Sequence, residues 1–208
     1  MGNFVHLHVH SHYSILDGMS KVPDLISKCQ KNGMNAMALT DHGNMFGIKD
    51  LVDTAGKING KCKKAVKECK ENIEKETDPA KKAELEAQLP ELEKKAAEYI
   101  PFKPIIGIEA YCARRTLYDK DKTFKEINAE TGRERIVDRS GWHLILLAKN
   151  KTGYRNLCKL SSIAYTDGFY DRPRIDHNVL EKWHEGVICC SACLGGEIPQ
   201  YILAGQID

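Results

Sequence analysis

The first stretch of the chain alternates apolar and polar side chains. Within residues 3–10, valine or leucine occupies positions 5, 7 and 9, and each is followed by a histidine, His6, His8 and His10. A period of two is typical of a β-strand. We therefore predict a strand over residues 3–10 with one apolar face and one imidazole face.

Helical and extended patterns then follow one another. Residues 22–31 have apolar side chains at helical spacing, Asn32-Gly33 ends that pattern, and residues 35–40 form a short apolar stretch. Strand, helix and strand within some 40 residues favour a parallel α/β fold. Further strands are predicted over residues 104–111, 143–148 and 187–191, and further helices over 45–58, over 154–165 and from residue 197.

Two segments depart from this repeat. Residues 61–98 contain lysine and acidic residues in equal number and no glycine, with a break at Thr77-Asp78-Pro79 where Asp78 can cap a helix that begins at Pro79. We interpret them as two charged helices that form an inserted, solvated arm, with Pro90 kinking the second; a docking surface for a partner is the alternative. Residues 114–140 are charged and aperiodic and are predicted to be a long loop.

Composition narrows the classes of protein. The chain has 208 residues, 42% of them hydrophobic, and no apolar run long enough for a membrane span, so no membrane partner is expected. A net charge of +2 excludes recognition by bulk basic charge, so any contact with nucleic acid must be local. Eight irregularly spaced cysteines without a signal peptide predict reduced thiols and a cytoplasmic location.

Side chains able to bind a metal lie at the ends of the predicted strands. They are His8, His10, Asp17, Asp41, His42, Glu109, His143 and Cys193. In a parallel α/β barrel the carboxyl ends of the strands meet at one rim. His143 is the exception because it begins its strand, and it reaches the same rim only if that strand runs antiparallel to the one carrying Glu109. Asp41 is predicted to orient a neighbouring histidine.

Imidazole, carboxylate and thiolate together favour zinc, manganese or iron over calcium or magnesium. Two or three such ions can bind a phosphate and activate water near neutral pH, which predicts phosphoester hydrolysis. The sequence has neither a Gly-x-Ser-x-Gly nucleophile motif nor a P-loop. An exposed His-x-His strand without a metal is the plain alternative, against which the apolar residues between the histidines argue.

Two short motifs, His8-Val-His-Ser11 and Thr40-Asp-His-Gly43, resemble those of the PHP (polymerase and histidinol phosphatase) superfamily. Longer segments resemble the N-terminal PHP domain of the bacterial DNA polymerase III alpha-subunit family, in the same order along the chain. These segments are residues 4–18, 40–47, 103–111, 143–150, 152–157, 168–175 and 191–199. Residues 61–98 and the loop after Arg115 have no counterpart in that pattern.

The resemblance implies a distorted (βα)₇ barrel over residues 1–208, incomplete at its C-terminal end, with the inserted arm 61–98 and the charged loop 114–140. It implies two or three zinc or manganese ions, or iron, with Glu109 as the bridging ligand. By position the metal ligands would be His8, His10, Asp17, His42, Glu109, His143 and Cys193. The family completes the set with a late Asp-x-His, and Asp176-His177 lacks that spacing, so fewer ions are expected here.

Three functions fit the resemblance. One is a metal-dependent 3′–5′ exonuclease that proofreads within a DNA-directed DNA polymerase, with primer-template DNA, its single-stranded 3′ end and the remainder of the polymerase chain as partners. The second is a non-catalytic scaffold that docks a separate proofreading exonuclease. The third is a free-standing phosphatase such as histidinol phosphatase, which the polymerase-type segments disfavour. Occupied ligand positions favour metal binding; without the polymerase palm, these residues are not expected to polymerise DNA.

Overall fold

The computed structural model describes residues 4–127, 132–139 and 141–206. Within them the elements follow in the order α1 (Val22–Lys31), β1 (Ala36–Leu39), α2 (Ile48–Lys75), α3 (Pro79–Glu98), β2 (Lys103–Ala113), β3 (Lys125–Ile127), β4 (Glu134–Ile136), the 3₁₀ turn η1 (Val137–Arg139), β5 (Gly141–Ala148), α4 (Lys151–Thr166), β6 (Arg174–Ile175), α5 (His177–Trp183), β7 (Val187–Cys190) and α6 (Glu197–Leu203). None of these helices combines the length and apolar character that crossing a membrane requires.

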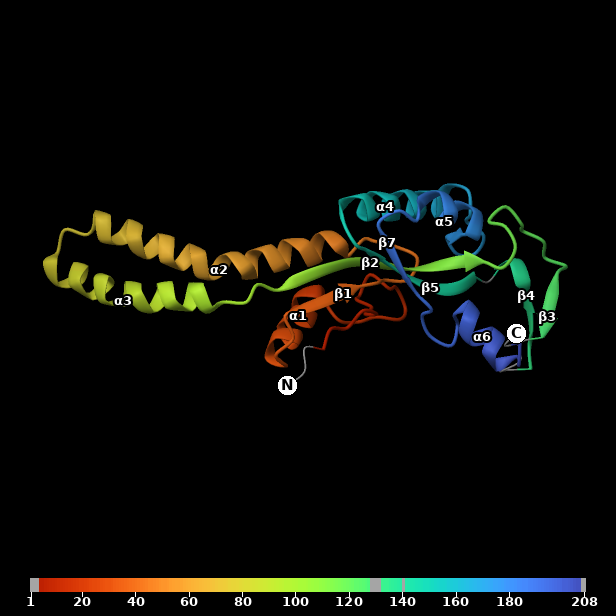
Figure 1. The fold of residues 1–208 in the computed structure, drawn as a ribbon, viewed down its shortest axis with the longest axis horizontal. Coiled ribbons are helices and arrows are strands. Elements are labelled where there is room, and N and C mark those ends of the chain that lie inside the picture. Colours follow the sequence, from red (N-terminus) through yellow and green to blue (C-terminus); the bar gives the residue numbers. More distant parts are fainter. Residues whose placement is uncertain (1–3, 128–131, 140, 207–208) are drawn as a thin grey trace.

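Strand β2 is the centre of the main sheet. It pairs in parallel with β1 and β6 and antiparallel with β5, and β7 adds antiparallel to β5, giving the order β1-β2-β5-β7 (Figure 1). The α/β fold class predicted from the sequence is confirmed, although the sheet is mixed rather than all parallel. The antiparallel direction of β5 brings His143 to the end of the sheet that carries Glu109.

Helices cover one face of the sheet, and the candidate ligand Glu109 lies on the other face. In β2, Ile108 and Ala110 pack with Leu157 and Leu160 of α4, and the side chains of β5 that pack there alternate in the same way. Because successive side chains of a strand point to opposite faces, Glu109 lies on the face away from α4. A second core forms where α1 and α2 pack against β1; its buried members are Val22, Ile26, Cys29, Met37, Leu39, Ile48, Leu51, Ala55 and Phe102.

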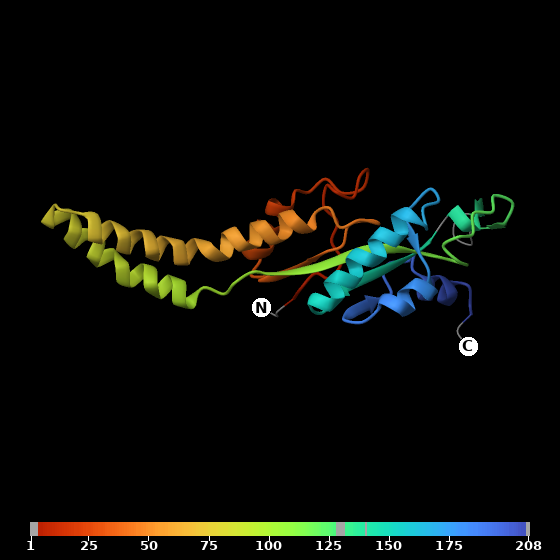
Figure 2. The ribbon, with the colours of Figure 1, turned by 90° about the horizontal axis from the view of Figure 1, so that it is seen from above.

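The charged insertion is a helical arm, but its first helix is not separate. Helix α2 was expected to end near residue 58, yet it continues without a break to Lys75, so its first turns belong to the core and its last turns to the arm. Helix α3 begins at Pro79 with the Asp78 side chain accepting from the N–H of Ala80, as predicted, and it runs on through Pro90. Both views show α2 and α3 side by side, projecting from the sheet (Figures 1 and 2).

The predicted first strand is wrong in detail. Residues 4–10 run beside β1 without forming a regular strand, and residue 3 lies outside the described residues. The N–H of Ala38 donates to the carbonyl of His6 (2.8 Å) and that of Thr40 to the carbonyl of Val9 (2.9 Å). The N–H of Val9, however, donates to the Thr40 hydroxyl (2.9 Å), so a side chain replaces the backbone acceptor of a regular ladder.

The long loop predicted over residues 114–140 contains structure that periodicity could not reveal. Strands β3 and β4 pair as a hairpin of three residues each, followed by η1; residues 128–131 and 140 lie outside the described residues. The buried guanidinium of Arg174 ties this segment to the rest of the fold: it donates to the carbonyls of Leu117 and Asp138 within the segment and to that of Gly168 outside it. Three-residue strands are too short for an alternating pattern to stand out.

Candidate metal centre

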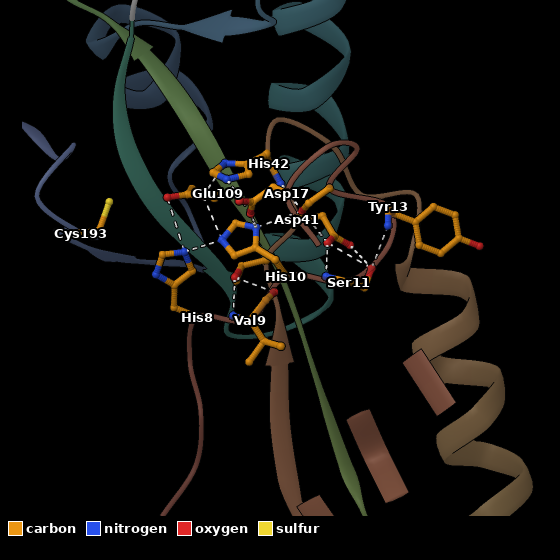
Figure 3. A network of polar contacts seen from close by, with 12 residues as sticks. His8, Val9, His10, Ser11, Tyr13, Asp17, Asp41, His42, Glu109 and Cys193 are labelled. Atoms are coloured by element: carbon orange, nitrogen blue, oxygen red, sulfur yellow. Dashed lines mark hydrogen bonds and ion pairs between the residues drawn. The ribbon is translucent and has the colours of Figure 1, made fainter. Parts of the chain in front are cut away.

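Glu109 is the centre of a cluster of imidazoles. Its side chain is 1% exposed, and four histidine nitrogens lie within 3.4 Å of its carboxylate oxygens. The distances are 2.6 Å to His42 Nδ1, 3.0 Å to His143 Nδ1, 3.2 Å to His10 Nε2 and 3.4 Å to His8 Nε2. Figure 3 shows how side chains from separate segments meet at this carboxylate.

The fold brings these histidines together from positions far apart in the sequence. His42 follows β1 and continues its parallel pairing as an isolated bridge to Glu109, and the N–H of Gly43 donates to the Glu109 carbonyl (2.8 Å). Gly43 has a φ of +62°, and a Cβ there would lie 2.8 Å from the ring of Pro173, so this turn requires glycine. His143 lies opposite Tyr111 in the antiparallel pair, two residues along β2 from Glu109.

The polar atoms at the core of the cluster lack hydrogen bonds. Among the described residues, Nδ1 of His42 and both carboxylate oxygens of Glu109 are buried without a hydrogen-bond partner, although nitrogen and oxygen atoms lie close together. Burial opposes ionisation of Glu109, but contacts with His10, His143 and His42 outweigh it and hold its pKa well below the usual range. The contact with Glu109 raises the pKa of His42, whereas burial lowers that of His8.

These atoms are grouped as metal ligands are. Three sets, each with its ligand atoms within 4.8 Å of one another, occur in the described residues: His8, His10 and Glu109; His10, Asp17 and His42; and His42, Glu109 and His143. Neighbouring sets share a member, which is how bridged ions are held. Imidazole and carboxylate donors suit zinc and manganese, and buried oxygens without hydrogen bonds are what a cation would satisfy. The residues therefore fit a cluster of such ions.

Asp41 belongs to a buried network behind the cluster and to none of these three sets. Its carboxylate accepts from the N–H of Ser11 (2.6 Å) and from the hydroxyl groups of Ser11 and Ser14, the latter at 2.8 Å. The Ser14 oxygen also accepts from the N–H of His42 (3.1 Å) and lies 2.9 Å from His10 Nδ1.

The Ser14 hydroxyl has one donor and two acceptor positions. Since its proton goes to Asp41, the Ser14 oxygen can accept from His10 Nδ1, and in a neutral imidazole this leaves Nε2, on the side of Glu109, as the nitrogen free to bind a metal. Ser14 is thus a positioning residue that the sequence analysis missed. A serine four residues after a candidate histidine ligand was the available signal.

Known proteins are similar to this chain over nearly its whole length. The PHP domain matches residues 6–208 of the chain. The chain belongs to the PHP domain family. This PHP domain is 43% identical over 205 residues to DNA polymerase III subunit alpha of Borreliella burgdorferi, a match that covers 99% of the chain and 13% of that protein.

The same subunit from other bacteria is also similar. Identity is 38% over 204 residues for Treponema pallidum and 34% over 207 residues for Thermus aquaticus, covering 98% and 99% of the PHP domain. The domain thus spans about 13% of the length of the relatives it matches. The resemblance seen in the sequence, to the PHP family and to the polymerase III alpha subunit, is confirmed.

Cys193 lies beside the metal-ligand sets of the PHP domain rather than inside them. Its Sγ is 3.6 Å from His143 Nδ1 and accepts from the N–H of Gly195 (3.4 Å), and Figure 3 shows it set apart from the other labelled ligands. The backbone next to it is fixed by a parallel bridge between His143 and Gly196. Of the predicted ligands, His8, His10, Asp17, His42, Glu109 and His143 are brought together, and Cys193 lies at the edge.

Two further residues at the site were missed in the sequence. The Tyr111 ring stacks against His42 (centroids 6.0 Å apart) and meets His143 edge to face (5.3 Å), and its hydroxyl accepts from Arg172 (2.6 Å). Tyr111 is on the same face of β2 as Glu109, two residues further on. A tyrosine two residues beyond a candidate glutamate was a usable signal; nothing in the sequence placed Arg172.

Proposed function

We propose that this PHP domain is the N-terminal part of a replicative DNA polymerase alpha subunit and that its histidine cluster hydrolyses phosphodiester bonds at a single-stranded 3′ end. The observation that carries the proposal is the Glu109 carboxylate, buried among four imidazoles with neither oxygen hydrogen-bonded to a described residue. A carboxylate removed from water in this way needs positive charge, and two or three zinc or manganese ions would supply it.

The residues proposed to hold these ions are His8, His10, Asp17, His42, Glu109, His143 and Cys193, with Glu109 shared between ions. Bound there, the metal would act as a Lewis acid toward a phosphoryl oxygen and toward water. Ser14 holds His10 in one tautomer, and Asp41 holds Ser14 in turn. The imidazoles are 19–33% exposed whereas Glu109 is closed to solvent, so a phosphate can approach from the histidine side.

A scaffold that only docks a separate exonuclease would not need this arrangement. Docking alone gives no reason to gather four imidazoles around one buried carboxylate whose oxygens lack hydrogen bonds to the described residues. The similarity to polymerase alpha subunits also disfavours a free-standing phosphatase. Nucleotide addition and the binding of primer-template DNA belong, in this proposal, to the rest of the longer protein.

The test is Glu109→Ala in the longer protein that contains this domain. Degradation of 3′-labelled single-stranded DNA with Mn²⁺ or Zn²⁺ should be lost and bound metal reduced, while nucleotide addition is kept because it uses a separate site. Glu93→Ala on the exposed face of α3 is the matched control and should leave both activities unchanged. If Glu109→Ala leaves the degradation intact, the nuclease proposal is wrong; if metal and degradation are absent from the wild type, the scaffold is favoured.

A further inference from the structure

A cavity adjoins the metal centre on the side of the β3–β4 hairpin. Its volume is about 560 Å³, and His143 forms part of its wall, so the cavity and the centre share a side chain. Its other notable lining residues are Arg114, Arg135, Arg139, Arg172 and Trp142. We call it the arginine cavity. Four guanidinium groups face two carboxylates in its lining, those of Glu134 and Asp171, in a chain whose net charge is only +2.

Arg172 is the arginine with the most unused hydrogen-bonding capacity. Among the described residues its guanidinium pairs with no carboxylate; it donates to the Tyr111 hydroxyl (2.6 Å) and lies 4.8 Å from the centre of that ring. Tyr111 in turn contacts His42 and His143. Arg172 is therefore fixed in place beside the metal ligands while most of its N–H groups are available to an anion.

The other arginines are held by the protein. Arg114 has a side chain that is 7% exposed, lies 3.6 Å from the centre of the Trp142 ring and forms an ion pair with Glu126. Its Nε is buried and has no hydrogen-bond partner among the described residues. Arg135 pairs with the same glutamate, and Arg139 pairs with Asp171 (3.1 Å). Groups fixed in this way lose little conformational entropy when they bind a ligand.

We propose that the arginine cavity binds the phosphodiester backbone of single-stranded DNA and directs the strand to the metal centre. The guanidinium fork matches phosphate oxygens in pairs. Arg114 and Arg135 meet at Glu126, whereas Arg139 pairs with Asp171, the residue next to Arg172 in the chain. The lining therefore holds two pairs of guanidinium groups, which suits more than one phosphate. This inference rests on the proposed function, for which it names the strand-binding surface.

The experiment measures binding without hydrolysis. Fluorescence anisotropy follows a 5′-labelled oligothymidylate of eight nucleotides added to the chain of residues 1–208 in EDTA. We expect Arg172→Ala and Arg139→Ala each to raise Kd about tenfold, the loss of one charge-assisted contact. Each should also reduce the slope of log Kd against log salt by about 0.7, the value for one phosphate of a single strand. Arg172→Lys should restore only part of the affinity because the fork is lost.

Arg155→Ala is the matched control. This exposed arginine lies near the start of α4, beyond the end of β5 opposite to His143, and its loss removes the same charge. Circular dichroism of every variant checks the fold. Equal Kd values for Arg172→Ala and Arg155→Ala would overturn the proposal. A second result would also overturn the proposal: inorganic phosphate at millimolar concentration displaces the octanucleotide completely, and a dinucleotide binds as tightly as the octanucleotide. That result would indicate a site for a single phosphate.

The outcome is separable from that of the proposed function. If Arg172-dependent binding is found but Mn²⁺-dependent hydrolysis is absent, the cavity binds a strand and the nuclease proposal alone fails. If Glu109-dependent hydrolysis is found while Arg172→Ala binds DNA as the wild type does, the cavity proposal alone fails.

Discussion

Replacing Glu109 by glutamine tests whether the cluster was built for a cation. The substitution keeps the shape of the side chain and removes its charge. It places an amide where one carboxylate oxygen now lies 2.6 Å from His42 and 3.2 Å from His10. Two of the three ligand sets contain Glu109, so both should lose affinity together.

The magnitude follows from linkage between binding and folding. A ligand present at one hundred times its Kd adds about 2.7 kcal/mol to the free energy of unfolding. For a chain of about 200 residues, this corresponds to a rise in Tm of roughly 5–10 °C. Glu109→Gln should remove most of that rise. In EDTA the variant should unfold close to the wild-type temperature, because the substitution relieves the burial of a charge but also removes that charge's contacts with the imidazoles of His10, His42 and His143.

Thermal unfolding by circular dichroism, with and without excess zinc, measures both effects. Glu93→Gln, on the arm and paired with Lys70 at 2.8 Å, serves as the control that loses the same charge elsewhere; it should keep the full zinc response. An equal zinc-dependent rise in Tm for Glu109→Gln and the wild type would refute the assignment of Glu109 as a ligand. A large loss of stability of Glu109→Gln in EDTA would show instead that the carboxylate stabilises the fold.

Three further predictions follow. Ser14→Ala should weaken zinc binding about 10- to 100-fold, because His10 loses the partner that orients its ring. Calorimetric titration with zinc measures this Kd, and an unchanged Kd would contradict the role of Ser14. Replacing residues 61–98 by a short linker should leave bound metal unchanged by elemental analysis, since the described ligand sets lie outside them; loss of metal would place the arm in the core. Burial raises the pKa of the Cys112 thiol to about 12, whereas the thiol of the unfolded chain ionises near pH 8.5. The free energy of unfolding should therefore fall as the pH rises from about 8.5 to 12. Cys112→Ala should reduce that fall in urea titrations at pH 8 and 10, and an identical pH dependence would contradict it.

The sequence predicted those helices and strands in which apolar side chains follow a clear local pattern. Helix α1 is found at its predicted residues, and β2, β5 and β7 lie within about two residues of their predicted ends. Apolar runs bounded by glycine or polar residues are strong local signals. The length of α2 was underestimated because its apolar pattern fades where it leaves the core, while charged residues of good helix propensity continue it.

The sequence predicted which ligand residues form the candidate site, but not the contacts that hold them in place. The histidines and Glu109 were identified because they lie at the ends of predicted strands. Whether His143 would join them depended on the direction of β5, which no local sequence pattern encodes. Ser14 is itself held by Asp41, 27 residues away, and Arg172 contacts Tyr111, 61 residues away; such pairing is set by the assembled fold. For the same reason the spacing in the sequence could not tell that Cys193 would lie at the edge.

The continuity of α2 has a mechanical consequence. Its first turn lies against the loop behind the metal centre: the Tyr13 hydroxyl donates to Asp50 (2.8 Å), and a Cβ on Gly47 would lie 2.9 Å from the Asp41 carboxylate. From there, 28 helical residues at 1.5 Å each give a rod about 42 Å long, so a tilt of about 5° at its base displaces its far end by about 4 Å. The base of this rod lies beside Asp41, so a contact that fixed the tip of the arm would also fix the angle at which α2 meets the loop that carries Tyr13.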